Sequence, residues 1–168
     1  EPFSEKNEKT IMAQGELIST NLFQLYMDEV DGNSVLLSAL DFMQIDQHAE
    51  PRTEVIQNRL SKVLANHSAR TFITQGFICR NINNEIDNLN RGGSDYSASL
   101  IGAAVQADQI QIWTDIDGMH NNDPRFVDHT FSVEELSFDE AAELAYFGAK
   151  ILHPQSIIPA QENNIPVL

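Results

Sequence analysis

The chain has 168 residues, 42% of them hydrophobic, which suits one domain with a buried core. It carries 25 acidic and 10 basic residues, a formal net charge of -15, which argues against nucleic acid or an anionic membrane as a partner. There is no run of 18 apolar residues and no charged-then-apolar leader, so we expect neither a membrane span nor secretion. The single cysteine, Cys79, excludes an internal disulfide and suits a small core residue in a reducing cytoplasm.

Residues 4–30 have the apolar spacing of one long helix, which the sequence Asp31-Gly32-Asn33 ends. We expect one apolar face of this helix to be buried, comprising Ile11, Gly15, Ile18, Leu22, Leu25 and Tyr26. A glycine in a helix interior costs roughly 1 kcal/mol relative to alanine, so Gly15 hints at close packing. Its neighbour Glu16, taken alone, is an ordinary surface charge.

The following segments alternate between strand and helix. Short apolar runs at residues 34–40 and 70–74 suit strands that are covered on both faces. The amphipathic segment 53–66 between them predicts a helix. Residues 76–89 hold two apolar stretches around a polar centre, which is typical of a β-hairpin.

The hairpin leads into the sequence Asn90-Arg91-Gly92-Gly93-Ser94-Asp95, and the small and apolar residues that follow predict a helix. Adjacent glycines allow positive φ and a close approach to a ligand, while Ser94 or Asp95 is suited to cap the helix. Free N–H groups and the positive end of the helix dipole would then meet a phosphate or carboxylate, with Arg91 as a bidentate donor. An ordinary strand-to-helix loop has the same composition, so this stretch alone leaves both interpretations open.

The C-terminal half begins with alternating residues at 109–114, which predict a further strand, followed by a long polar loop at 114–125. Open α/β sheets bind ligands at the carboxyl ends of their strands. The Asp-rich spacing of the loop resembles a calcium site, but no glutamate stands at the twelfth position, so calcium is not expected. Ser137 with Glu140 is a capping-box pattern ahead of a helix at 140–148.

A last short helix at 155–163 completes an α/β fold, an αβα sandwich with a mainly parallel central sheet. After Arg80 the only basic residues are Arg91, Arg125 and Lys150. These three are the candidates to neutralise a polyanion such as a nucleoside triphosphate, together with a divalent cation held by carboxylates. The alternative for Lys150 is an exposed side chain without a role.

Six stretches, in this order, resemble the aspartokinases of the amino-acid kinase superfamily: Gly15-Glu16-Leu17-Ile18-Ser19-Thr20, Thr74-Gln75-Gly76-Phe77, Arg91-Gly92-Gly93-Ser94-Asp95-Tyr96, Trp113-Thr114-Asp115-Ile116-Asp117-Gly118, Asn122-Asp123-Pro124-Arg125 and Tyr146-Phe147-Gly148-Ala149-Lys150-Ile151-Leu152-His153-Pro154. The resemblance implies ATP- and Mg²⁺-dependent phosphorylation of the side-chain carboxylate of L-aspartate to 4-phospho-L-aspartate. That reaction is the first step of lysine, threonine and methionine synthesis. We therefore expect a cytoplasmic transferase that is a homo-oligomer in its full-length form.

The resemblance also implies roles for individual residues. Glu16 would hold the substrate ammonium and Arg91 its α-carboxylate. The path of the substrate and the phosphoryl group would be lined by Gly92, Gly93 and Ser94. Asp95 and Lys150 would be catalytic, with Asp95 organising the catalytic lysines. The nucleotide-binding positions would be Thr114, Asp115, His120, Arg125, Lys150 and Ile151; His120 stands where the family has tyrosine. No metal ligand is assigned.

The family begins with a strand carrying the sequence Lys-Phe-Gly-Gly and ends in regulatory ACT domains, and we find neither among these residues. We therefore expect residues 1–168 to be a partial catalytic domain, incomplete at both ends and inactive alone. One alternative is a non-catalytic module of the same fold that binds a nucleotide or amino acid. Another is an enzyme for a different carboxylate or carbamate. The pair Glu16 and Arg91 favours a free amino acid, because its ammonium and its α-carboxylate both need partners.

Overall fold

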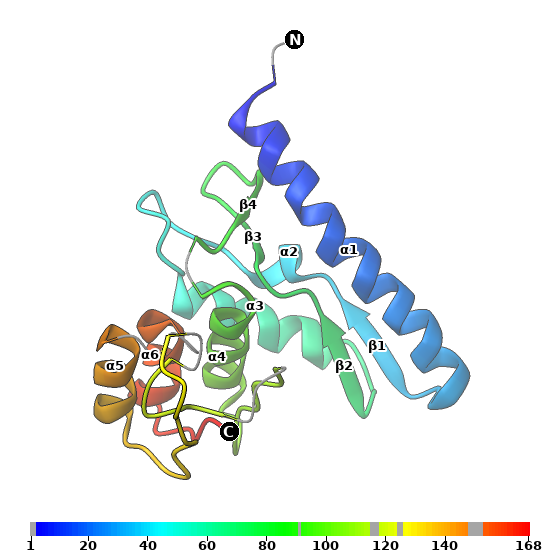
Figure 1. The fold of residues 1–168 in the computed structure, drawn as a ribbon. Helices are drawn as coiled ribbons and strands as arrows, with labels where there is room; N and C mark the ends of the chain where they lie inside the picture. Colours follow the sequence, from blue (N-terminus) through cyan, green and yellow to red (C-terminus); the bar gives the residue numbers. More distant parts are fainter. Residues whose placement is uncertain (1–2, 91, 115–117, 124–125, 148–152) are drawn as a thin grey trace.

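The computed structural model describes residues 3–90, 92–114, 118–123, 126–147 and 153–168 (Figure 1). The helices and strands follow in the order α1 (Glu5–Val30), β1 (Ser34–Leu37), α2 (Ala39–Phe42), α3 (Thr53–Ala65), β2 (Thr71–Thr74), β3 (Ile78–Arg80), β4 (Ile86–Asn88), α4 (Gly93–Val105), α5 (Phe138–Phe147) and α6 (Pro154–Glu162). None of the helices in this part of the chain is both long and apolar enough to cross a membrane.

The strands confirm the predicted α/β class. β1 and β2 pair in parallel, from Ser34 opposite Thr71 to Leu37 opposite Thr74, and α3 lies in the crossover between them. β3 and β4 form the predicted antiparallel hairpin. The segment after α2 also pairs in parallel with β3, because the Ile45 N–H donates to the Arg80 carbonyl at 2.9 Å. Parallel pairing of this kind needs a crossover connection, which the helices supply.

The strand predicted at residues 109–114 is present only as a parallel bridge between Ile110 and Val167. The Ile110 N–H donates to the Pro166 carbonyl at 2.9 Å, and the Leu168 N–H donates to the Ile110 carbonyl at 2.8 Å. The pairing partner is thus the short segment after α6. These backbone hydrogen bonds lie on one side of the segment only, and within the described residues they do not extend into a full strand.

The C-terminal helices lie close to their predicted positions. α5 begins at Phe138 behind the predicted capping box, in which the Ser137 N–H donates to Glu140 Oε2 at 2.8 Å. The Glu140 N–H donates in return to Ser137 Oγ at 3.2 Å. Hydrogen bonds from Ser137 stabilise the ionised carboxylate and lower the pKa of Glu140.

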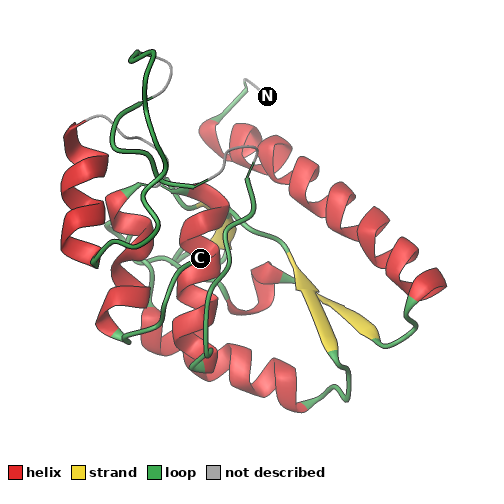
Figure 2. Ribbon diagram, turned by 60° about the horizontal axis from the view of Figure 1, so that its bottom comes forward, coloured by secondary structure: helices red, strands yellow, loops and turns green. Residues whose placement is uncertain are grey.

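The elements form layers, with α1 on one side of the strands and the other long helices on the opposite side (Figures 1 and 2). α4 packs against α3 and α6, and α5 packs against α6. The main core lies between these layers and comprises Ala13, Leu37, Ala39, Leu40, Phe42, Met43, Ile45, Ile56, Leu60, Ile78, Cys79, Leu89 and Leu100. Residues from α1, α2, α3, the hairpin and α4 therefore share one apolar interior.

The face of α1 that is buried differs from the predicted one. The helix starts as expected, with Ser4 as its N-cap, but its buried residue is Ala13, and Leu17 packs against the core. The predicted inner side chains are exposed by more than half: Ile11 62%, Ile18 59%, Leu22 61%, Leu25 63% and Tyr26 58%. We call these five residues the outer face of α1. The prediction that this face is buried was wrong. Polar side chains on the opposite face of α1 bond to the β3–β4 hairpin and to the residue after β2, and these bonds orient the helix.

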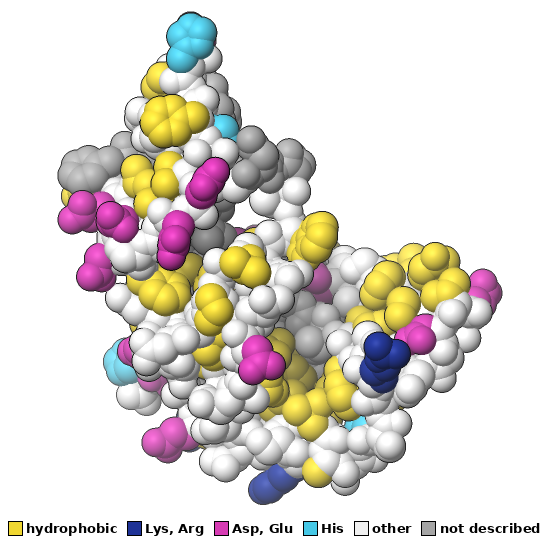
Figure 3. Space-filling model, turned by 90° about the horizontal axis from the view of Figure 1, so that it is seen from below, with side chains coloured by type: hydrophobic (Ala, Val, Ile, Leu, Met, Phe, Trp, Pro, Cys, Tyr) yellow, Lys and Arg dark blue, Asp and Glu magenta, His cyan; other side chains and the backbone are white. Residues whose placement is uncertain are grey.

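The outer face of α1 adds apolar area to one arm of the molecule. Figure 3 shows hydrophobic side chains gathered on the right-hand arm, where the end of α1 and the β1–β2 pair lie. Contiguous exposed apolar surface of this kind marks an interaction site.

We expect the 168-residue chain to self-associate through the outer face of α1. Ile18→Glu with Leu22→Glu should make it monomeric without lowering its melting temperature, because both side chains already contact water. Light scattering coupled to gel filtration measures the mass, and Ala13→Glu, at a buried site, serves as the destabilising control. A chain that is monomeric before any substitution would contradict this expectation.

Candidate functional site

The candidate site is built around the start of α4. Gly92 and Gly93 both have positive backbone φ, 72° and 47°, and Gly92 is the N-cap. The expectation that Ser94 or Asp95 caps the helix was wrong, because both lie inside its first turn and no side chain caps the helix. The first N–H groups of a helix have no partners within it, so this end offers donors and a positive dipole to an anion.

The two polar side chains of this first turn have different surroundings. Ser94 is exposed, whereas Asp95 is half-buried, and this burial raises the pKa of the Asp95 carboxyl. No lysine or arginine among the described residues forms an ion pair with Asp95. Its predicted partner Lys150 lies outside the described residues.

The turn between β2 and β3 is packed against the first turn of α4. A Cβ added to Gly76 would lie 2.8 Å from the Ser94 Cβ and 3.0 Å from its Cα, so only glycine fits there. One residue later the Phe77 N–H donates to Ser97 Oγ at 2.8 Å. The end of β2 is thereby attached directly to the start of α4.

The same turn connects the site to α1. The Gln75 side chain, only 2% exposed, donates through Nε2 to Thr20 Oγ1 at 2.8 Å. The Thr20 hydroxyl in turn donates to the backbone carbonyl of Glu16, one helical turn earlier, at 2.7 Å. This chain of contacts joins the α1 segment that carries Glu16 to the turn that meets α4.

Glu16 is half-buried, and its carboxylate has no ion pair or hydrogen bond with the described part of the chain. A partly desolvated carboxylate favours a cation as its partner. The contacts above connect the backbone at Glu16, through Thr20, Gln75 and Gly76, to a helix start that favours an anion. A small ligand with one positive and one negative group, such as an amino acid, suits this arrangement.

The predicted nucleotide-binding positions are only partly described. Arg91, Asp115, Arg125, Lys150 and Ile151 lie outside the described residues. Thr114 is exposed, just after the segment that pairs with the C-terminal residues. His120 is half-buried, with its Nδ1 2.9 Å from Thr130 Oγ1, and its backbone pairs with Ser132. The segments on either side, around His120 and around residues 130–132, thus lie against each other.

Metal binding has no preformed cage in the described residues, where no three His, Cys, Asp or Glu side chains converge. Mg²⁺ does not require such a cage, since it is usually bound by one or two carboxylates together with substrate phosphates. Of the three aspartates in the predicted loop at 114–125, Asp115 and Asp117 lie outside the described residues, and Asp123 is buried.

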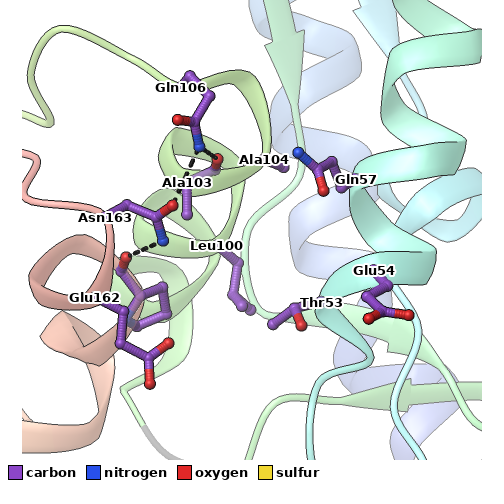
Figure 4. A pocket seen from close by; sticks show the side chains of 10 residues that line it. Thr53, Glu54, Gln57, Leu100, Ala103, Ala104, Gln106, Glu162 and Asn163 are labelled. Atoms are coloured by element: carbon purple, nitrogen blue, oxygen red, sulfur yellow. Dashed lines mark hydrogen bonds between the residues drawn. The ribbon is translucent and has the colours of Figure 1, made fainter.

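Among the described residues, hollows of two kinds border α4 or the turn before it. The hollow in Figure 4, about 190 Å³, lies between α3, α4 and α6, and its lining includes Glu54, Leu100 and Asn163 but no predicted site residue. We therefore do not assign it to the site. A second hollow, about 320 Å³, is lined by His48, Ala49, Glu50, Leu89, Asn90, Tyr96 and Gln155. It borders the glycine turn, because Leu89 and Asn90 come directly before it in the chain.

Sequence reasoning did not assign a role to Thr20 or Gln75. Both stand in stretches that resemble a family, yet their contact joins positions 55 residues apart. The one available signal was a glutamine next to a glycine at the end of a buried strand, where a buried amide needs partners.

Residues 4–168 match the model of the amino acid kinase family. The chain is 37% identical to lysine-sensitive aspartokinase 3 of Escherichia coli (strain K12) over 94% of its length and 36% of the relative's. It is 32% identical to the chloroplastic bifunctional aspartokinase/homoserine dehydrogenase 2 of Arabidopsis thaliana, over 98% of the chain and 18% of that relative. The chain thus spans little more than a third of the E. coli relative.

The fold is similar to those of solved aspartokinases. The structure of E. coli aspartokinase III in complex with aspartate and ADP matches with a TM-score of 0.87 at 34% identity, over 98% of this chain and 38% of that one. Aspartate kinase from Synechocystis matches with a TM-score of 0.78 at 30% identity, over 99% of this chain and 28% of the other.

Substitution of the two glycines should separate backbone strain from steric overlap. Both have positive φ, which costs a side-chain-bearing residue about 1–2 kcal/mol. A Cβ at Gly92 would also lie 2.8 Å from the Ser156 Cβ, whereas nothing lies within 4 Å of one at Gly93. We expect Gly92→Ala to lower the free energy of unfolding more than Gly93→Ala in urea titrations. Equal losses would contradict the close contact at Gly92.

Proposed function

We propose, because the chain belongs to the amino acid kinase family, that it is the central part of an aspartokinase. The reaction would be transfer of the γ-phosphoryl group of ATP to the side-chain carboxylate of L-aspartate, yielding 4-phospho-L-aspartate and ADP. The observation that carries the proposal is the connection of Glu16, through Thr20 and Gln75, to the glycine-opened start of α4. The complex of the similar E. coli enzyme with aspartate and ADP supports it.

The proposed roles follow from the charges of the substrate. Glu16 would accept hydrogen bonds from the substrate ammonium, and Arg91 would grip the α-carboxylate with two N–H donors. The amides at Gly92, Gly93 and Ser94 would line the path along which the side-chain carboxylate meets the phosphoryl group. Aspartate would thus be bound at both ends of its backbone, with its side chain free to react.

The chemistry needs alignment and charge compensation rather than a general base. An aspartate side chain has a reference pKa of about 3.9, so the nucleophilic carboxylate is already ionised at neutral pH. A carboxylate oxygen forms the new bond to the γ-phosphorus while the bond to the β–γ bridging oxygen breaks and ADP leaves. Lys150 would compensate the developing charge, and Asp95 would orient the lysine side chains.

The nucleotide would be held by Thr114, Asp115, His120, Arg125, Lys150 and Ile151. Mg²⁺ bound to the phosphates would supply further positive charge. Asp115 is the carboxylate among these residues, and it follows the 110–112 segment closely in the sequence. Cations are needed locally, because the chain as a whole carries a formal charge of -15.

We also propose that the native protein has further parts of the kinase domain and regulatory ACT domains, and that it forms a homo-oligomer. The support is the span of the chain, 36% of the similar E. coli relative, and the exposed outer face of α1, which a further segment would cover. We place it in the cytoplasm, whose reducing conditions suit a single buried thiol.

Aspartate-dependent release of ADP by the full-length protein tests the function directly. Arg91→Lys should raise the KM for aspartate while leaving the KM for ATP unchanged, because a point charge does not reproduce a planar two-bond grip. The loss should be roughly 1.5–3 kcal/mol, as for a hydrogen bond to a charged partner. An unchanged KM for aspartate would remove Arg91 from the substrate site.

The absence of any aspartate-dependent ADP release from the wild type would instead favour a non-catalytic module that binds a nucleotide or amino acid. Release of ADP that depends on another carboxylate or on a carbamate would keep the enzyme and change its substrate.

Lys150→Ala should weaken the binding of MgATP without altering the fold. The substitution would remove the cation proposed at the phosphates, and lysine side chains, which are rarely buried in full, contribute little packing. Thermal melts with and without MgATP measure the effect, and Lys62→Ala, in the last turn of α3, is the matched control. A ligand-induced shift as large in Lys150→Ala as in Lys62→Ala would show that Lys150 has no role at the nucleotide.

A further inference from the structure

We propose that two side-chain pairs, Lys9 with Asp87 and Thr20 with Gln75, position Glu16 relative to the start of α4. The inference rests on the proposed function, since Glu16 acquires its role only if the substrate carries an ammonium group. Lys9, Asp87, Thr20 and Gln75 would act through Glu16 and the glycine turn without touching the substrate. They are therefore positioning residues.

The helical repeat places Glu16 between the two pairs. Lys9 precedes Glu16 by seven residues and Thr20 follows it by four, so all three lie on one face of α1. Ala13, which is 1% exposed, lies on the same face and reaches the core. This inner face of α1 thus has a polar contact on either side of Glu16, while the outer face is exposed.

The first pair attaches α1 to β4. Lys9 Nζ lies 2.8 Å from Asp87 Oδ1, and the Asp87 side chain is only 9% exposed. Asp87 Oδ1 also accepts the Asn88 N–H at 2.8 Å, and Glu5 lies 3.0 Å from Lys9 Nζ. The hydrogen bond to Asp87 raises the pKa of Lys9, which keeps the lysine charged well above neutral pH. β4 runs directly into the glycine turn, so this pair sets where the turn begins relative to α1.

The surroundings of Asp87 make its countercharge important. The neighbouring strand β3 places the fully buried Cys79 opposite Asp87, and burial, with the charge of Asp87, raises the pKa of Cys79 to about 12. A buried carboxylate beside apolar groups is costly without a cation. Lys9 is the cation that the described structure provides.

The second pair attaches α1 to the end of β2. Gln75 donates to Thr20 Oγ1 and, through Oε1, accepts the Ala39 N–H at the start of α2, both at 2.8 Å. The next residue, Gly76, is in contact with Ser94 of α4. Gln75 therefore ties three elements together beneath the site. Because the Thr20 hydroxyl also donates to the Glu16 carbonyl, a shift of this contact moves the backbone of Glu16 itself.

The inference predicts a selective kinetic effect in the full-length protein. Thr20→Val, which keeps the shape but removes the hydroxyl, should lower kcat/KM for aspartate by about 10- to 100-fold, as expected for a misplacement near 1 Å. The KM for ATP should stay unchanged. Thr20→Ser keeps the hydroxyl and should restore wild-type kinetics.

A matched pair of lysine variants tests the other contact. Lys9→Met should have the same selective effect as Thr20→Val. Lys6→Met is the control, because Lys6 joins the same helix to the same hairpin through Glu85, but in an exposed pair with side chains 63% and 36% accessible. If Lys9→Met does not fold, the double variant Lys9→Met with Asp87→Asn removes both charges and takes its place.

The outcomes distinguish the two proposals. Normal aspartate kinetics in Thr20→Val, even with a lowered melting temperature, would show that the contact is only structural and would overturn the positioning inference alone. Equal effects on aspartate and ATP would overturn it as well. A wild type without aspartate-dependent turnover would remove the proposed function, and this inference with it.

Discussion

At Gly76 the turn after β2 comes so close to α4 that a methyl group would overlap Ser94. The candidate site depends on this contact, since it brings a strand end and a helix start into one place. Gln75 on one side of Gly76 reaches α1 and α2, and Phe77 on the other side bonds to α4. A single missing side chain thus allows three helices to meet around one turn.

The charge of the chain explains why such a site would use backbone groups. With a formal charge of -15, the chain repels the anionic groups of the proposed substrates. The start of α4 supplies N–H donors and a positive dipole without adding a side-chain cation that nearby acids would neutralise. The basic residues expected at the site, Arg91, Arg125 and Lys150, would then complete a binding surface whose fixed part is the backbone.

α1 shows how a helix is positioned by polar contacts rather than by its most apolar stripe. Apolar contact is non-directional. The ion pair at Lys9 and the hydrogen bond at Thr20, by contrast, fix both the rotation of α1 about its axis and its position along that axis. The outer face is left to water, and Ala13 permits the close approach of the inner face to the core. Glu16 owes its half-buried place to this choice of face.

Local patterns in the sequence were sufficient for much of the fold. The long first helix, the helix that became α3, the hairpin and the capping box at Ser137 were all predicted, because periodicity, caps and turn residues act over a few positions. The glycine turn and the order of the motifs pointed to an anion site and to a family whose model matches residues 4–168.

Four features were decided only by tertiary structure: the buried face of α1, the cap at Gly92, the bond between Gln75 and Thr20, and the reduction of residues 109–114 to a bridge. Each depends on which groups from distant parts of the chain are adjacent. Burial, hydrogen-bond partners and strand pairing are properties of that neighbourhood, which no local pattern contains.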